Sequence, residues 1–172
     1  MFYRMSNAQK RGEAILEFIN KNLEESDLIL GKFKDRQPLK CKIALGKRLY
    51  DANFFNDGIN SSISEKFFKA LNDNDLKGWE VYNLEIEKTN DKHYGLQIIG
   101  RCGNLIKPEQ KGFYVGYEFD QETWDGSDFF CPEGTALIFC TERAKKILED
   151  NGLTNIEFED ISKVETYSLG RK

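Results

Sequence analysis

An 18-residue segment near the middle of the chain recurs near its C-terminal end. Residues 64–81, SEKFFKALNDNDLKGWEV, align without gaps with residues 141–158, TERAKKILEDNGLTNIEF, and seven of the eighteen positions are identical. Each copy opens with a serine or threonine that suits a helix N-cap, and a glutamate follows that complements the positive end of the helix. Each then reaches a residue suited to a left-handed helix end, Asn74 or Gly152. The repeat predicts two helix-turn-strand units, whether it arose by duplication or by shared local rules.

The periodicity of apolar residues predicts the other elements. Over residues 7–25 apolar side chains recur at helical spacing, which predicts an amphipathic opening helix. Over residues 39–45 apolar residues alternate with lysines, as in a half-buried edge strand. Further elements are expected as helices near 64–73 and 141–151 and as strands at 79–86, 93–99, 113–119 and 136–140.

These elements predict a single α+β domain over residues 1–172, with a mixed or mainly antiparallel sheet and about three helices. Within it, residues 1–60 form an N-terminal helix and basic strand region. Residues 61–172 contain the two helix-turn-strand units.

Composition excludes several classes of protein. The chain has 172 residues, of which 40% are hydrophobic, as in an ordinary globular domain. Its longest apolar run, residues 136–140, is far below the roughly 20 residues of a membrane helix. The four cysteines form no CxxC motif and His93 is the single histidine, which excludes zinc fingers and two-histidine metal sites. We therefore expect a cytoplasmic protein that uses neither a membrane nor a cofactor.

Charge is distributed unevenly along the chain. Residues 1–50 hold 11 basic and 6 acidic side chains, and residues 51–172 hold 14 and 23, so the two parts carry +5 and −9. Residues 112–135, the acidic segment, contain six acidic and seven aromatic residues and neither lysine nor arginine. The resulting negative electrostatic potential favours a basic partner for the C-terminal part and argues against binding of nucleic acid there.

The residue types of the acidic segment allow two interpretations. Carboxylates at short spacing hold hard divalent cations in many proteins, but these match no EF-hand loop and aromatic residues interrupt them. Contact with a partner is favoured, because tryptophan and tyrosine dominate binding hot spots and carboxylates around them steer cationic partners. The predicted partner-binding residues, on a loop over 124–130 and just before it, are Asp120, Glu122, Trp124, Asp125, Asp128 and Phe129.

We assign structural roles to two further features of the sequence. Apolar and aromatic residues alternate over 113–119, which predicts a strand whose aromatic side chains face the core. His93 lies in a turn that enters a strand, so we assign it to structure rather than to acid-base catalysis, and no catalytic residue is predicted. The alternative function is a small divalent-metal-dependent hydrolase or nuclease that uses the carboxylates of residues 120–128.

Residues 124–161 resemble the C-terminal part of bacterial polymorphic-toxin immunity proteins. The shared pattern is a W-x-G-x-D-hydrophobic stretch, a strand, Thr-Glu-Arg at the start of a helix, and a Leu-Thr-Asn turn into a final strand, here WDGSDFF, TER and LTN. Residues 64–86 and 93–99 are similar to the middle of the same proteins, so the resemblance spans residues 60–161. The chain lacks the paired CxxCG motifs that some relatives carry.

The resemblance implies a cytoplasmic antidote that binds a cognate toxin and blocks it, with no catalysis or cofactor of its own. Many toxins of this class are basic nucleases, and the acidic bias of the C-terminal part agrees with such a partner. The predicted function is therefore that of an immunity protein.

Overall fold

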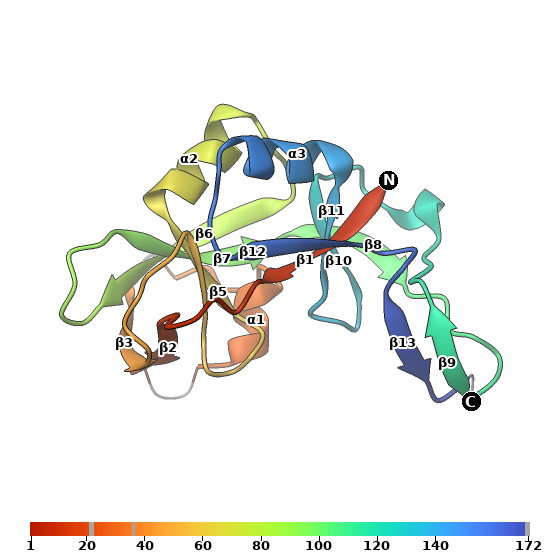
Figure 1. The fold of residues 1–172 in the computed structure, drawn as a ribbon, viewed down its shortest axis with the longest axis horizontal. Coiled ribbons are helices and arrows are strands. Elements are labelled where there is room, and N and C mark those ends of the chain that lie inside the picture. The colour runs from red at the N-terminus through yellow and green to blue at the C-terminus, as the bar shows by residue number, and fades with distance from the viewer. Residues whose placement is uncertain (21–22, 36, 171–172) are drawn as a thin grey trace.

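Two sheets, of six and five strands, form the body of the molecule (Figure 1). The computed structural model describes residues 1–20, 23–35 and 37–170. The six-stranded sheet has the order β2-β3-β6-β7-β5-β4, built from β2 (Ile15–Phe18), β3 (Leu39–Leu45), β4 (Ala52–Phe54), β5 (Ser61–Ser64), β6 (Trp79–Ile86) and β7 (His93–Ile98). The five-stranded sheet has the order β12-β1-β11-β10-β8, built from β1 (Phe2–Asn7), β8 (Gly100–Asn104), β10 (Phe129–Glu133), β11 (Ile138–Thr141) and β12 (Ile156–Asp160). The remaining elements are α1 (Glu25–Ile29), α2 (Glu65–Asp73), α3 (Glu142–Asp150), the 3-10 helix η1 (Gln121–Thr123), and a ribbon of β9 (Gly112–Val115) and β13 (Glu165–Ser168).

The predicted α+β class is confirmed, although strands outweigh helices. Most strand pairs are antiparallel, while β3 with β6 and β8 with β10 are parallel, so both sheets are mixed. The three helices equal the expected number within the described chain. The strands expected at 39–45 and 79–86 coincide with β3 and β6, and those expected at 93–99 and 136–140 differ from β7 and β11 by one or two residues.

The two helix-turn-strand units are confirmed. The hydroxyls of Ser64 and Thr141 cap α2 and α3, each accepting a hydrogen bond from the backbone N–H three residues further on, at 3.1 and 3.2 Å. The left-handed residue after the first helix is Asp75 rather than the expected Asn74, and after the second it is Gly152, as expected. Local sequence therefore determines both the start and the end of these helices.

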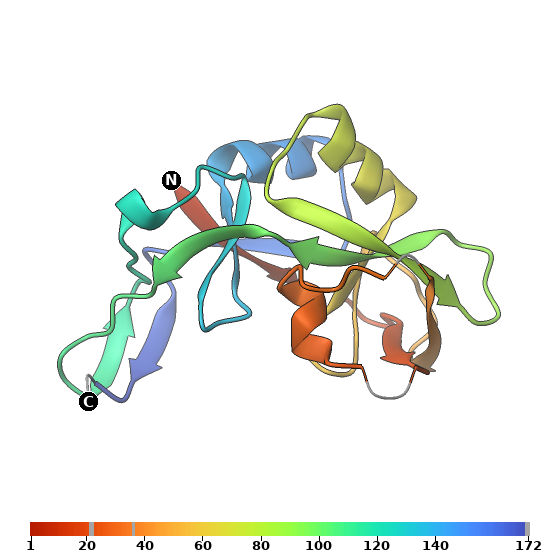
Figure 2. The same ribbon diagram turned by 180° about the vertical axis from the view of Figure 1, so that it is seen from behind.

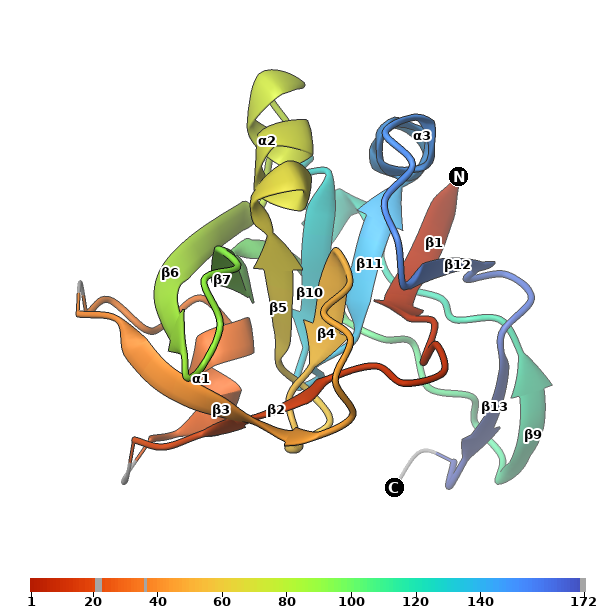
Figure 3. The ribbon, with the colours of Figure 1, turned by 60° about the vertical axis from the view of Figure 1, so that its left-hand side comes forward.

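Both units have the same topology. The helix α2 joins β5 to β6, and α3 joins β11 to β12; in each sheet one antiparallel strand, β7 or β1, lies between the joined pair. Each unit is therefore a split β-α-β motif, and the two motifs belong to different sheets. The helices lie side by side above the sheets (Figure 3).

One core holds the two sheets together. Met5, Phe67, Leu96, Phe129 and Leu148, from both sheets and both longer helices, are buried in the same cluster. The strands β7 and β8 are separated by a single residue, and together they run from one sheet into the other (Figure 2). The regions 1–60 and 61–172 belong to one body at this point, since β4 and β5 pair across residue 60.

The predicted opening helix over residues 7–25 is wrong. In the described part of this stretch, a turn and β2 follow β1, and α1 begins only at Glu25; positions 21 and 22 lie outside the described residues. Leu16 is fully buried on β2, which pairs with β3. Glu13 is also buried, and its Oε1 accepts a hydrogen bond from the backbone N–H of Phe54 at 3.0 Å. Pairing with distant strands therefore overrides a helical spacing of apolar residues.

Candidate protein-binding site

The acidic segment is divided between the surface and the core. Asp120, Glu122 and Asp125 are exposed, Trp124 is half-buried, and Asp128 and Phe129 are buried. The predicted loop over 124–130 ends at Asp128, because β10 begins at Phe129. Phe129 is 1% exposed and belongs to the main core. The six predicted residues therefore do not form one continuous exposed surface.

Asp128 links the two split β-α-β motifs. Its Oδ2 accepts hydrogen bonds from the backbone N–H of Lys77, at 2.9 Å, and from Nη1 of Arg143, at 2.7 Å. Its Oδ1 accepts one from the hydroxyl of Thr141, the N-cap of α3, at 3.0 Å. Arg143 in turn donates to the carbonyl oxygen of Asn74, at the end of α2. Asp128 therefore stabilises the contact between the two units.

Trp124 is packed against the body of the molecule. Its ring meets that of Phe2 edge-on, with centroids 5.1 Å apart, and it also contacts Phe130 at 5.6 Å. Its indole N–H donates to the carbonyl oxygen of Ser127 at 3.1 Å. One side of the indole therefore stabilises the loop, and only the remaining part is accessible to a partner.

Three of the four carboxylates in residues 120–128, those of Asp120, Asp125 and Asp128, have separate hydrogen-bond partners. Asp120 accepts from the N–H of Glu122 at 3.0 Å and so caps η1. Asp125 accepts from the N–H of Arg101 at 2.8 Å and ties the loop to the edge of β8. In the part of the chain that the structure describes, no three His, Cys, Asp or Glu side chains gather in a way that could hold a metal ion.

The single histidine and the cysteines lie inside the fold. His93 is 6% exposed, with Nδ1 3.4 Å from the hydroxyl of Ser62, and burial lowers its pKa below the ordinary value of 6.5. All four cysteines are free and buried. Burial raises the pKa of the thiols to about 11 in Cys102 and to about 12 in Cys41 and Cys131. Thiols with such pKa values remain protonated at neutral pH and are poor nucleophiles.

The most exposed apolar surface lies on the ribbon of β9 and β13. The rings of Phe113 and Tyr167 stand opposite each other, 5.0 Å apart, and the two residues are 86% and 48% exposed. Val115 and Leu169, on the same outer face by strand alternation, are 69% and 75% exposed. Figures 1 and 2 show this ribbon projecting from one end of the molecule.

The ribbon corrects the prediction of a core strand over 113–119. The strand β9 ends at Val115, because Gly116 has a φ of 93° and turns the chain back toward the body. Only the later aromatic residues are covered: Phe119 is buried and Tyr117 packs beside it. Phe113 and Val115 face solvent instead of the core.

A hollow of about 740 Å³ lies between the ribbon and the ends of β8 and β10. Tyr114 and Thr166, on the inner face of the ribbon, line it, and Ile106 also contributes an apolar surface. Val115, Tyr167 and Leu169 border the same hollow. Its charged lining residues are Lys107, Glu109, Glu118 and Glu133. Three of the four exposed apolar residues of the ribbon therefore adjoin an acidic hollow.

Sequence reasoning did not select Tyr167 or Leu169. Over residues 165–169 the alternation places Glu165, Tyr167 and Leu169 on one face and the small polar residues Thr166 and Ser168 on the other. A strand with no apolar inner face has nothing to bury against a sheet. That pattern is the signal that the apolar side chains at 167 and 169 point outward.

Comparison of the sequence with protein-family models and with curated proteins finds no match. Among the described residues, no helix has the length and apolar character needed to cross a membrane. The candidate site therefore rests on the geometry of the ribbon and its surroundings.

Proposed function

We propose that this protein is an immunity-type antidote, a binding module of the bacterial cytoplasm that sequesters and inhibits a basic protein toxin without catalysis of its own. The observation that carries the proposal is the apolar outer face of the ribbon, formed by Phe113, Val115, Tyr167 and Leu169. Glu165 lies opposite Val115 on the same face, so these apolar side chains adjoin a carboxylate. Exposed apolar surface with a polar rim marks sites that a partner covers.

Charge supports a basic partner. The hollow beside the ribbon is lined by Glu109, Glu118 and Glu133 against Lys107. Carboxylates at the rim of an interface speed the approach of a cationic partner and fix its orientation. Four free cysteines agree with a reducing compartment.

In the proposed complex the two kinds of residue act differently. The aromatic pair Phe113 and Tyr167 loses its water on binding and contributes most of the affinity, as buried aromatic anchors do. The carboxylates stay near solvent, so they affect the association rate and its dependence on salt more than the affinity. Trp124 and Asp128, which the sequence analysis placed in the interface, stabilise the fold that presents these residues.

The test is binding to the toxin encoded beside this gene, measured by calorimetry with purified proteins. Wild-type protein is expected to inhibit the toxin stoichiometrically. The double variant Phe113→Ser, Tyr167→Ser should weaken binding at least about 30-fold, because it removes both aromatic anchors. The matched control is Leu45→Ser, which removes a side chain that is 68% exposed on β3, and it should leave affinity within about twofold.

The proposal fails if wild-type protein does not inhibit the toxin, or if the double variant, shown to be folded by circular dichroism, binds as tightly as the control. Titration with Mg²⁺, Mn²⁺ and Ca²⁺ addresses the alternative of a metal-dependent hydrolase or nuclease. Specific binding at micromolar concentration to the carboxylates of residues 120–128 would favour that enzyme over the antidote.

A further inference from the structure

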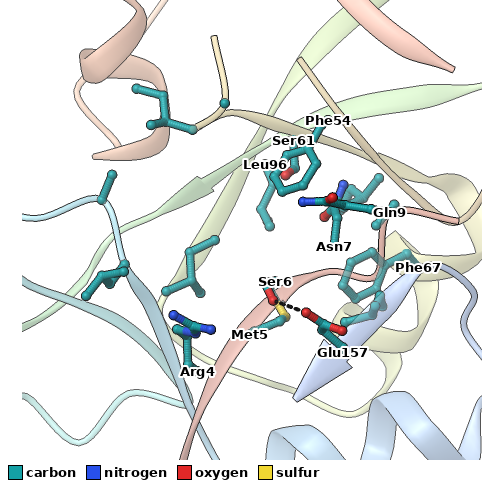
Figure 4. A pocket seen from close by; sticks show the side chains of 18 residues that line it. Arg4, Met5, Ser6, Asn7, Gln9, Phe54, Ser61, Phe67, Leu96 and Glu157 are labelled. Carbon is teal, nitrogen blue, oxygen red and sulfur yellow. Dashed lines mark hydrogen bonds between the residues drawn. The ribbon is translucent and has the colours of Figure 1, made fainter. Parts of the chain in front are cut away.

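A second cavity lies between the two sheets, on a different surface from the ribbon, and has a volume of about 390 Å³ (Figure 4). It is bordered by β1, β11 and β12 of the five-stranded sheet, by β4, β5 and β7 of the six-stranded sheet, and by α2. This volume falls in the range of roughly 300–1,000 Å³ that is typical of small-molecule sites.

The wall of this inter-sheet cavity is mainly apolar. Met5, Ile63, Phe67 and Leu96 belong to the main core and present one side of it to the cavity. Other apolar lining residues come from both sheets and from the turn before β11: Ala52, Phe54, Ile59, Ala136, Leu137, Ile138 and Ile156. Water in such a space has few hydrogen-bond partners, so an apolar ligand that displaces it gains free energy.

A few polar groups interrupt the apolar wall. Arg4 donates from Nη2 to Glu159 at 2.6 Å, but its Nε is buried and has no hydrogen-bond acceptor among the described residues. Figure 4 shows Arg4, Ser6 and Glu157 on one side of the cavity and Ser61 on the other. Nε of Arg4 has almost no accessible surface, so a ligand in the cavity would meet the other polar groups and not this donor.

The charges select against an anion. The positive charge of Arg4 is already balanced by Glu159, and the exposed Glu157 adds a further negative charge to the lining. A carboxylate or sulfonate would therefore meet net repulsion here. An uncharged molecule avoids that cost.

We propose that the inter-sheet cavity binds a small uncharged and mainly apolar molecule, with its apolar body against Phe67 and Leu96. The inference is independent of the antidote proposal, because the cavity and the ribbon share no lining residue. The volume of the cavity, its mainly apolar wall and its charges together define this class of ligand.

The test uses Nile red, an uncharged apolar dye with a ring carbonyl, and reads its fluorescence in a titration with full-length protein. Saturable binding of one dye per chain is expected. Ala136→Trp fills the cavity from a half-buried turn position and should weaken binding at least about tenfold.

Three controls make the result specific. Glu159→Gln breaks the ion pair with Arg4 but leaves the lining of the cavity unchanged, so affinity should stay within about twofold. Phe113→Ser, Tyr167→Ser should also leave dye binding unchanged, which separates this cavity from the ribbon. Anilinonaphthalene sulfonate, an anionic apolar dye, should bind wild-type protein at least about tenfold more weakly than Nile red does. Glu157→Gln should reduce this difference in affinity between the two dyes, because it removes a negative charge from the lining.

The proposal is overturned if Nile red does not bind, if binding survives Ala136→Trp in a protein with wild-type circular dichroism, or if the ribbon variant abolishes it. If Ala136→Trp does not fold, Ile59→Trp fills the cavity from the loop between β4 and β5 and carries the same expectation. Equal binding of the anionic dye would refute the assigned ligand class.

Discussion

Asp128 is expected to stabilise the fold even though it lies in the most acidic part of the sequence. Replacing it with alanine removes the acceptor for three donors: the backbone N–H of Lys77, the hydroxyl of Thr141 and the guanidinium of Arg143. These donors come from the turn after α2 and from the start of α3. The substitution therefore separates two motifs that otherwise share one buried carboxylate.

The expected loss follows from the three contacts. A hydrogen bond to a charged group contributes about 1.5–3 kcal/mol, and this value applies to the Lys77 N–H, while the Thr141 hydroxyl contributes about 1 kcal/mol. The Arg143 side chain is 52% exposed, so its ion pair adds at most about 1 kcal/mol. Asp128→Ala should thus lower the free energy of unfolding by about 3–4 kcal/mol and the Tm by about 10 °C.

Urea unfolding followed by tryptophan fluorescence measures this loss. Asp128→Asn, which keeps one carbonyl oxygen, should lose about half as much as alanine. Glu122→Gln changes an exposed carboxylate of the same segment and should shift the free energy of unfolding by less than about 0.5 kcal/mol. If Asp128→Ala unfolds with the midpoint of Glu122→Gln, the link between the motifs does not contribute to stability and the reasoning is refuted.

Three further predictions concern buried groups. Trp124→Ala should lower the free energy of unfolding by about 2–3 kcal/mol, because it removes the contact between the half-buried indole and Phe2. An unchanged midpoint in urea would instead favour the exposed partner-binding residue that the sequence predicts. Gly95→Ala should cost about 1–3 kcal/mol in thermal unfolding, because a Cβ there would overlap the buried ring of Tyr82, and the cost should shrink in a Tyr82→Leu background. Burial lowers the pKa of His93, so as the pH falls the imidazole is protonated in the unfolded chain before it is protonated in the folded protein. The free energy of unfolding should therefore fall by up to about 1.4 kcal/mol per pH unit below pH 6.5. His93→Gln should lack this part of the decline between about pH 7 and about pH 5.5. If wild type and variant show the same dependence of unfolding free energy on pH, burial of a neutral His93 does not contribute to it.

The sequence predicts the two repeated units well because their determinants are local. A capping hydroxyl, an amphipathic stretch and a turn residue lie within eighteen positions, and each acts on its own backbone neighbours. What the repeat did not reveal is that each unit is a split β-α-β motif. The inserted strand β1 comes from the other end of the chain, so no local pattern records its position.

The opening stretch shows the opposite situation. Its apolar residues have helical spacing, yet Leu16 is buried on a strand whose partner, β3, begins more than twenty residues later. Formation of that pair buries Leu16 against Cys41 and Phe55, which an isolated amphipathic helix could not do. Tertiary burial decides the structure wherever local propensity is weak.

The candidate site also shows that the sequence pattern of a strand does not determine which of its faces is buried. Alternation over residues 113–119 is compatible with a core strand and with an exposed ribbon, because a period of two indicates only that alternate side chains share a face. Which face is covered depends on the pairing strand. Here that strand is β13, whose inner residues Thr166 and Ser168 are small and polar, so the ribbon does not bury its apolar side in a sheet. Phe113 and Tyr167 are left in solvent by that pairing, and the apolar surface they form is what makes the ribbon the strongest candidate for a docking surface.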